Sequence, residues 1–164
     1  MNPIISQDAM RIVAQAIELL SRPALPFEAH IGSHMRHIIE HFESLLNAST
    51  RVDYDDRARD VSLQTNRAVA LQRLTKLHNR LSQLTAHALA QPIEVCLRCG
   101  EAGEFESVSQ STVARELMFV ASHATHHYAI IKLHCASLGI NMAASFGKAP
   151  ATVAFEQTNL RSIS

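Results

Sequence analysis

The chain has 164 residues, of which 47% are apolar and 18% are charged, and it contains no tryptophan. This composition is typical of a globular protein with one core of ordinary size, so we expect a single domain over residues 1–164. Fifteen basic residues balance fifteen acidic ones. The charge therefore gives no support for a nucleic-acid partner.

No apolar run reaches the roughly 18 residues that a membrane span needs. The first residues, MNPIISQDAMRIV, lack the basic region and the long apolar stretch of a signal peptide. Three cysteines, an odd number, favour a reducing compartment over a disulfide framework. We therefore expect a cytoplasmic protein without a membrane partner.

The first half of the chain predicts two amphipathic helices. Residues 6–21 place apolar side chains at helical intervals, and Pro23 and Pro26 end this helix. Residues 33–48 predict the second helix. The polar segment 49–65 carries too many charges and too little periodicity to be a core element.

A third helix and a hairpin are predicted next. Leucines recur at helical intervals over residues 66–90. Residues 91–110 alternate apolar and polar side chains around Gly100 and Gly103, which predicts a β-hairpin with a loop of three to five residues.

The last long helix is predicted to begin at Ser111 or Thr112, both plausible N-caps, and to end at Leu138 before Gly139. The tail over residues 140–157 is expected to be ordered only by packing. Together these elements predict an all-α fold. It is an antiparallel four-helix bundle with a small β-hairpin between helices three and four.

Histidines are concentrated on the last helix, in the stretch SHATHHYAIIKLH. His123 and His127 lie about 40° apart around the helix axis, and this i, i+4 spacing lets two imidazoles bind one ion. His134 and Glu116 each fall about 20° from His123, so they share its stripe. His126 lies about 60° from the stripe and is expected to be peripheral.

The second helix carries its own stripe, because His34, His37 and His41 fall within about 60° of arc. His30 would continue this stripe if Gly32 did not intervene. Facing helices of a bundle commonly build metal sites from inward-pointing side chains. Two ligands from the last helix and one from the second would make a three-histidine site.

Such a site has the chemistry of a catalytic metal centre, since three neutral ligands leave coordination positions open. Imidazole suits zinc, nickel, iron or copper. Two other interpretations remain. A histidine on an apolar face is often a hydrogen-bonded core residue, and clustered histidines can sense pH. Neither of these requires the i, i+4 spacing.

The segments IGSHMRHIIEHFESLL and HATHH resemble the DinB-like (YfiT-like) superfamily of metal-binding four-helix bundles. The resemblance implies a ligand at His37, from the I-G-x-x-x-x-H pattern, and two more at His123 and His127. Spacing alone places His34 and His41 closer to the apolar face, so these two are candidates to hydrogen-bond a ligand histidine or to be ligands themselves. After His127 the chain reads YAII instead of the family's frequent H-R-G-Q ending, which indicates a divergent branch.

The resemblance also implies a class of activity. Members include S-transferases and isomerases that use low-molecular-weight thiols, and others are described as metal-dependent hydrolases. We therefore expect a small-molecule substrate, a thiol being one candidate, and a divalent ion, zinc or nickel first and iron second.

Residues 52–60 gather Tyr54, Arg57 and Arg59 among aspartates. We predict that these three are catalytic residues that orient an acidic or electrophilic substrate, because arginine can bind a carboxylate in a bidentate way. The alternative is a solvated loop with local ion pairs. Tyr128, next to His127, could donate to a substrate, but core packing is the simpler interpretation.

The cysteines are weaker candidates. Cys96 and Cys99 have the spacing of a zinc knuckle, but no second pair exists, and a regular strand would point them to opposite faces. Cys135 is expected to be a buried thiol.

Two functions from different classes follow. The first is a metalloenzyme for thiol-dependent transfer or hydrolysis. The second is a metal-binding or sensing module without turnover, or a pH-responsive helical interaction domain, acting as a homodimer.

Overall fold

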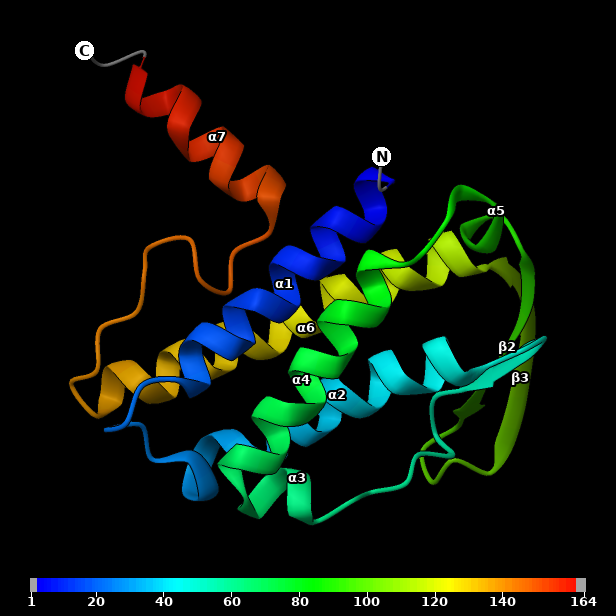
Figure 1. Ribbon diagram of the computed structural model, residues 1–164, viewed down its shortest axis with the longest axis horizontal. Coiled ribbons are helices and arrows are strands. Elements are labelled where there is room, and N and C mark those ends of the chain that lie inside the picture. Colours follow the sequence, from blue (N-terminus) through cyan, green and yellow to red (C-terminus); the bar gives the residue numbers. More distant parts are fainter. Residues whose placement is uncertain (1–2, 162–164) are drawn as a thin grey trace.

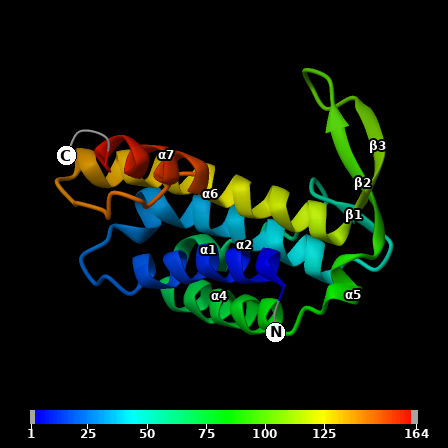
Figure 2. The same ribbon diagram turned by 90° about the horizontal axis from the view of Figure 1, so that it is seen from above.

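A computed structural model describes residues 3–161, with the side chains of residues 160 and 161 left out. The chain is mostly helical and carries a small three-stranded sheet. The longest helices pack α1 against α4 and α6, and α2 against α4 and α6 (Figures 1 and 2). They are α1 (Ile4–Leu20), α2 (Gly32–Asn47), α4 (Arg67–Ser82) and α6 (Val113–Ser137).

The sequence predicted three of these helices to within two residues at each end. The boundaries of α6 have identifiable causes. The Thr112 side chain accepts a hydrogen bond from the backbone N–H of Arg115 at the start of α6. Gly139 follows that helix with φ of +72°, a conformation that other residues rarely adopt.

The prediction of one helix over residues 66–90 is wrong in its last third. Asn66 caps α4 as an N-cap residue does, but the helix ends at Ser82. Thr85 is extended, and its hydroxyl caps a new short helix, α5 (Ala86–Leu89). The leucine periodicity continues across this break because Leu84 and Leu89 still pack on the same core.

The predicted hairpin is confirmed, but it is part of a larger sheet. Strands β2 (Pro92–Cys99) and β3 (Phe105–Thr112) pair antiparallel, and β1 (Arg51–Asp53) pairs parallel to β2. Figure 2 shows the sheet at one end of the long helices.

The sequence interpretation of residues 49–65 is therefore wrong. This segment holds β1 and the short helix α3 (Ser62–Thr65), and it buries Val52, Tyr54 and Leu63. Parallel pairing with a strand some forty residues away leaves little local signal, so periodicity did not reveal it.

The tail also differs from the expectation, because it contains α7 (Pro150–Arg161), which leads away from the other helices in Figure 1. The connection to α7 is fixed by Phe146, whose buried ring stacks on Tyr128 at 5.0 Å. The Lys132 ammonium donates to three backbone carbonyls of this connection, including that of Phe146.

The entry to α2 is unusual. A π-helical turn, η1 (Phe27–Ile31), runs directly into the helix through Gly32. A Cβ atom on Gly32 would lie 1.9 Å from the carbonyl oxygen of Gln64 in α3. Glycine at this position therefore allows α3 to approach α2 closely, and the chain continues from η1 into α2 without a break.

Gly32→Ala should lower the free energy of unfolding by about 2 kcal/mol or more, because the added methyl group meets backbone and not a movable side chain. Urea unfolding followed by circular dichroism measures the change. Ser33→Ala, an exposed neighbour on the same helix, is the control and should stay within about 0.5 kcal/mol of the parent protein. Equal stability of the Gly32→Ala variant would contradict the close approach.

Candidate metal centre

Helices α2 and α6 lie side by side (Figure 2), and histidines of α2 contact histidines of α6. Apolar residues next to each stripe hold this orientation, since Met35 and Ile38 on α2 and Val120 and Ala124 on α6 are all buried. The 3.6-residue period places the histidines beside that apolar face. The imidazoles therefore meet at the edge of the core.

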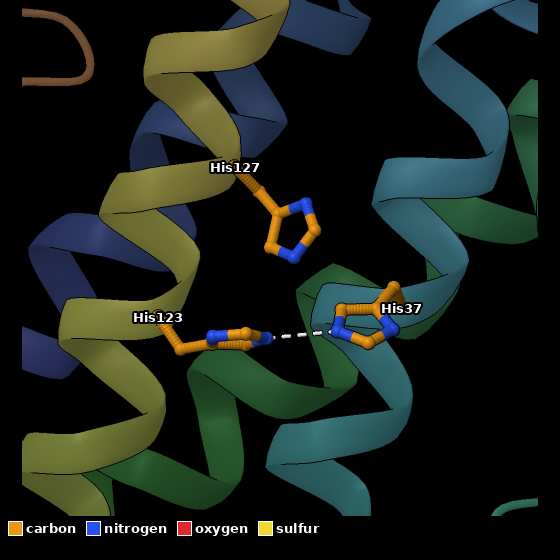
Figure 3. A group of neighbouring side chains, drawn as sticks. All are labelled: His37, His123 and His127. Atoms are coloured by element: carbon orange, nitrogen blue, oxygen red, sulfur yellow. Dashed lines mark hydrogen bonds between the residues drawn. The ribbon is translucent and has the colours of Figure 1, made fainter. Parts of the chain in front are cut away.

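His37, His123 and His127 form the centre of this arrangement. One ring nitrogen from each lies within 4.8 Å of the other two, and all three residues are partly buried. The Nε2 atoms of His37 and His123 are 2.8 Å apart. In Figure 3 a ring nitrogen of His127 points into the space between the other two rings.

The donor set fits a divalent transition ion. An ion with bonds of about 2.1 Å in tetrahedral geometry holds its ligand nitrogens about 3.4 Å apart. Three nitrogens within 4.8 Å reach that spacing through small rotations of the rings. The facing Nε2 atoms of His37 and His123 would otherwise need a proton between them, whereas an ion accepts both lone pairs at once.

Other imidazoles surround this group. The Nδ1 atom of His34 is 2.8 Å from the Nδ1 atom of His127, and the two rings tilt against each other. His41 is buried, and its Nδ1 donates to the backbone carbonyl of His37 at 2.7 Å. Neither His34 nor His41 contributes an atom to the central group. Farther out, exposed His30 and His134 stack at 5.3 Å.

Burial keeps the central imidazoles uncharged at neutral pH. Desolvation, followed by neighbouring histidines, lowers the pKa of His37 to about 3 and that of His127 to about 4. Desolvation also lowers the pKa of His123, and it lowers the pKa of His41 to about 4. A neutral imidazole binds a cation without first losing a proton, so these shifts favour metal binding.

The three predicted catalytic residues lie in different environments. Tyr54 is buried, its hydroxyl donates to Glu116 at 3.0 Å, and its ring stacks on His41 at 5.5 Å. Arg59 is exposed and donates to a backbone carbonyl of its own loop. Arg57 is partly buried and lies close enough to the cluster to lower the pKa of His37. Of these three side chains, Arg57 is the one whose charge acts on His37, His41 and His123.

Arg57 has an acidic partner on α2, the side chain of Glu40. The carboxylate of Glu40 is 4% exposed, lies 3.8 Å from the Nε atom of Arg57, and accepts from the backbone N–H of Asp60. That Nε atom is buried and has no hydrogen-bond partner among the described residues. Glu40 follows His37 by three residues on α2, and this spacing was the sequence signal that places its carboxylate next to the histidines.

A cavity of about 580 Å³ opens beside this ion pair. Its lining includes Glu40, Glu43, Arg51, Arg57 and Arg73. Arg73 forms a two-point pair with Glu43, with distances of 2.5 and 2.6 Å. Both members of the Arg57–Glu40 pair line the cavity, whereas His37, His123 and His127 do not.

The remaining candidates have structural positions. Glu116 is buried and accepts from Tyr54 and from the Ser111 hydroxyl. The Tyr128 hydroxyl is buried and donates to the carbonyl of Ile12, as core packing would require. Cys96 is buried and Cys99 exposed, while Cys135 is buried as expected.

Residues 11–131 match the family model described as the DinB superfamily. The chain belongs to the DinB superfamily. It is also 28% identical over 150 residues to a protein named FK506-binding protein 5 from Rhizopus delemar. That alignment covers 90% of this chain and 37% of the relative, so the chain spans little more than a third of the relative's length.

No solved structure matches the chain. Within the described residues, no helix combines the length and the apolar character that crossing a bilayer requires.

The metal-free protein should lose stability as the pH falls from about 6.5 toward 4. In the folded state His37 and His127 bind protons only near pH 3 to 4, whereas in the unfolded state they bind them near 6.5. The unfolded state therefore takes up more protons in this window, which favours unfolding. Thermal unfolding of chelator-treated protein at several pH values measures the effect.

A matched pair of variants isolates the cause. His37→Gln combined with His127→Gln should flatten the pH dependence, because the desolvated imidazoles are gone. His87→Gln, which changes an exposed histidine on α5, should leave the slope unchanged. An equal slope in all three proteins would assign the acid sensitivity to other groups.

Proposed function

We propose that this DinB-superfamily chain holds one divalent metal ion on His37, His123 and His127 and is a metal-dependent enzyme. The observation that carries the proposal is the convergence of three uncharged imidazole nitrogens from two facing helices within 4.8 Å. The helices α1, α2, α4 and α6 serve in this proposal as the antiparallel four-helix bundle that the family resemblance implies.

The number of protein ligands, three partly buried histidines, supports a catalytic role over a structural one. Structural zinc sites are closed by four protein ligands, whereas three ligands leave positions for a small molecule. A bound ion would lower the pKa of a coordinated water or thiol and stabilise developing negative charge. Imidazole ligands are compatible with zinc or nickel, and also with iron.

The chain's own residues would prepare the site for such a substrate. We assign substrate orientation to Arg57, since its guanidinium lies near the histidines and keeps a buried N–H without a partner among the described residues. A carboxylate entering from the adjoining cavity would satisfy that N–H.

Tyr54 and Arg59 have other roles in this proposal. Tyr54 supports the centre through the stacking of its ring on His41, because its hydroxyl is already engaged by Glu116. Arg59 lies on the exposed loop and would contact only a large substrate.

Replacement of His123 or His127 with alanine should abolish stoichiometric metal, because two remaining imidazoles are too few for a stable site. Elemental analysis of protein purified without a histidine tag measures this. The control combines His78→Gln with His87→Gln, which removes two histidines on α4 and α5 and should retain the ion. Full metal content in the two alanine variants would overturn the ligand assignment.

Replacing both Cys96 and Cys99 with serine should leave the metal content unchanged, because the buried and the exposed thiol do not share a face. The same elemental analysis applies. A loss of metal in this variant would move the site to the sheet.

A panel of glutathione, bacillithiol, mycothiol and cysteine distinguishes thiol-dependent transfer from hydrolysis. Calorimetry with the metal-loaded protein should show binding of one of these thiols, and the metal-free protein should show none. Arg57→Met, which keeps the aliphatic part of the side chain, should retain the metal and weaken binding of the thiol's carboxylate by roughly tenfold. Binding of no thiol would favour hydrolysis.

A further inference from the structure

The contact between His34 and His127 concerns the ring nitrogen of His127 that does not face the central group. The two Nδ1 atoms are 2.8 Å apart, which is a hydrogen-bond distance. Because Nδ1 of His127 is engaged with His34, Nε2 is the nitrogen available to an ion beside His37 and His123. The two nitrogens of this one ring therefore serve two different partners.

Counting the ring protons shows which of the two imidazoles donates the hydrogen bond between His34 and His127. A neutral histidine carries one ring proton, and the nitrogen that binds a metal must carry none. If Nε2 of His127 binds an ion, its proton is on Nδ1, and that N–H donates to Nδ1 of His34. The Nδ1 atom of His34 must then be unprotonated, so its own proton is on Nε2.

This arrangement excludes an alternative that the sequence left open. His34 cannot bind the same or another ion through Nε2 while it accepts the hydrogen bond from a metal-bound His127, because that nitrogen carries the proton. His41 is held in the opposite tautomer, since its Nδ1 donates to the carbonyl of His37. His34 and His41, which lie one turn before and one turn after His37, therefore carry their ring protons on different nitrogens.

We infer that His34 is a positioning residue that fixes the tautomer and ring orientation of His127 for metal binding. The inference rests on the proposed three-histidine site. Metal-bound histidines usually donate their second N–H to a carboxylate, a carbonyl or water. Here a neutral imidazole from the facing helix accepts that hydrogen bond, and His34 is held between His127 on one side and His134 on the other.

Two substitutions of similar size separate hydrogen bonding from packing. The side-chain oxygen of asparagine occupies nearly the position of Nδ1 in histidine, so His34→Asn keeps an acceptor for His127. His34→Leu keeps a similar volume and removes the acceptor. Competition with a chromogenic zinc chelator should show affinity reduced by about 10- to 100-fold in His34→Leu and by less than about threefold in His34→Asn.

His30→Leu is the matched control, because His30 is exposed and stacks on His134 without touching His127. It should bind zinc as the parent protein does. Thermal unfolding of each metal-free variant verifies that it is folded. Unchanged affinity in His34→Leu, or equal losses in His34→Leu and His34→Asn, would overturn the inference.

A spectroscopic readout tests the tautomer directly. In the zinc-loaded protein, ¹⁵N resonances should show His34 protonated at Nε2 and His127 protonated at Nδ1. A proton on Nδ1 of His34 would contradict the assignment. Failure of the proposed function looks different, since His123→Ala would then keep its zinc. If His123→Ala loses zinc while His34→Leu keeps it, only the role of His34 is wrong.

Discussion

The cluster of His37, His123 and His127 depends on the way α2 and α6 pack against each other. Each helix places histidines next to a buried apolar stripe, so the burial of Met35 and Val120 also fixes where the imidazoles point. The core thus provides the free energy that holds three uncharged donors in one small volume. Without this packing the same residues would be solvated separately, and no shared ligand sphere would form.

Burial has two consequences for the chemistry of the centre. It lowers the pKa of the histidines, which keeps their lone pairs available at neutral pH. It also strengthens the electrostatic influence of Arg57, which is itself balanced by the buried Glu40 carboxylate. The guanidinium of Arg57 thus has the Glu40 carboxylate as a neighbour and also acts on the pKa of His37.

The family assignment and the geometry answer different questions. Membership of the DinB superfamily identifies the kind of fold, whereas the packing of α2 against α6 is what brings His37, His123 and His127 together. The contact between His34 and His127 comes from the geometry, and the inference drawn from it gives a role to a further imidazole of the second helix. The name of the Rhizopus delemar relative describes a longer protein, of which this chain matches only a part.

The sequence by itself determined the helices that carry the histidines, because periodicity and capping are local properties that residues such as Thr112 and Gly139 reveal directly. The tertiary structure decided what lies between helices. The parallel pairing of β1, the burial of Tyr54 and the pairing of Arg57 with Glu40 depend on residues distant in sequence. The choice among the histidines of the second helix likewise required ring orientations, since three positions on one stripe differ only in which neighbour they meet across the interface.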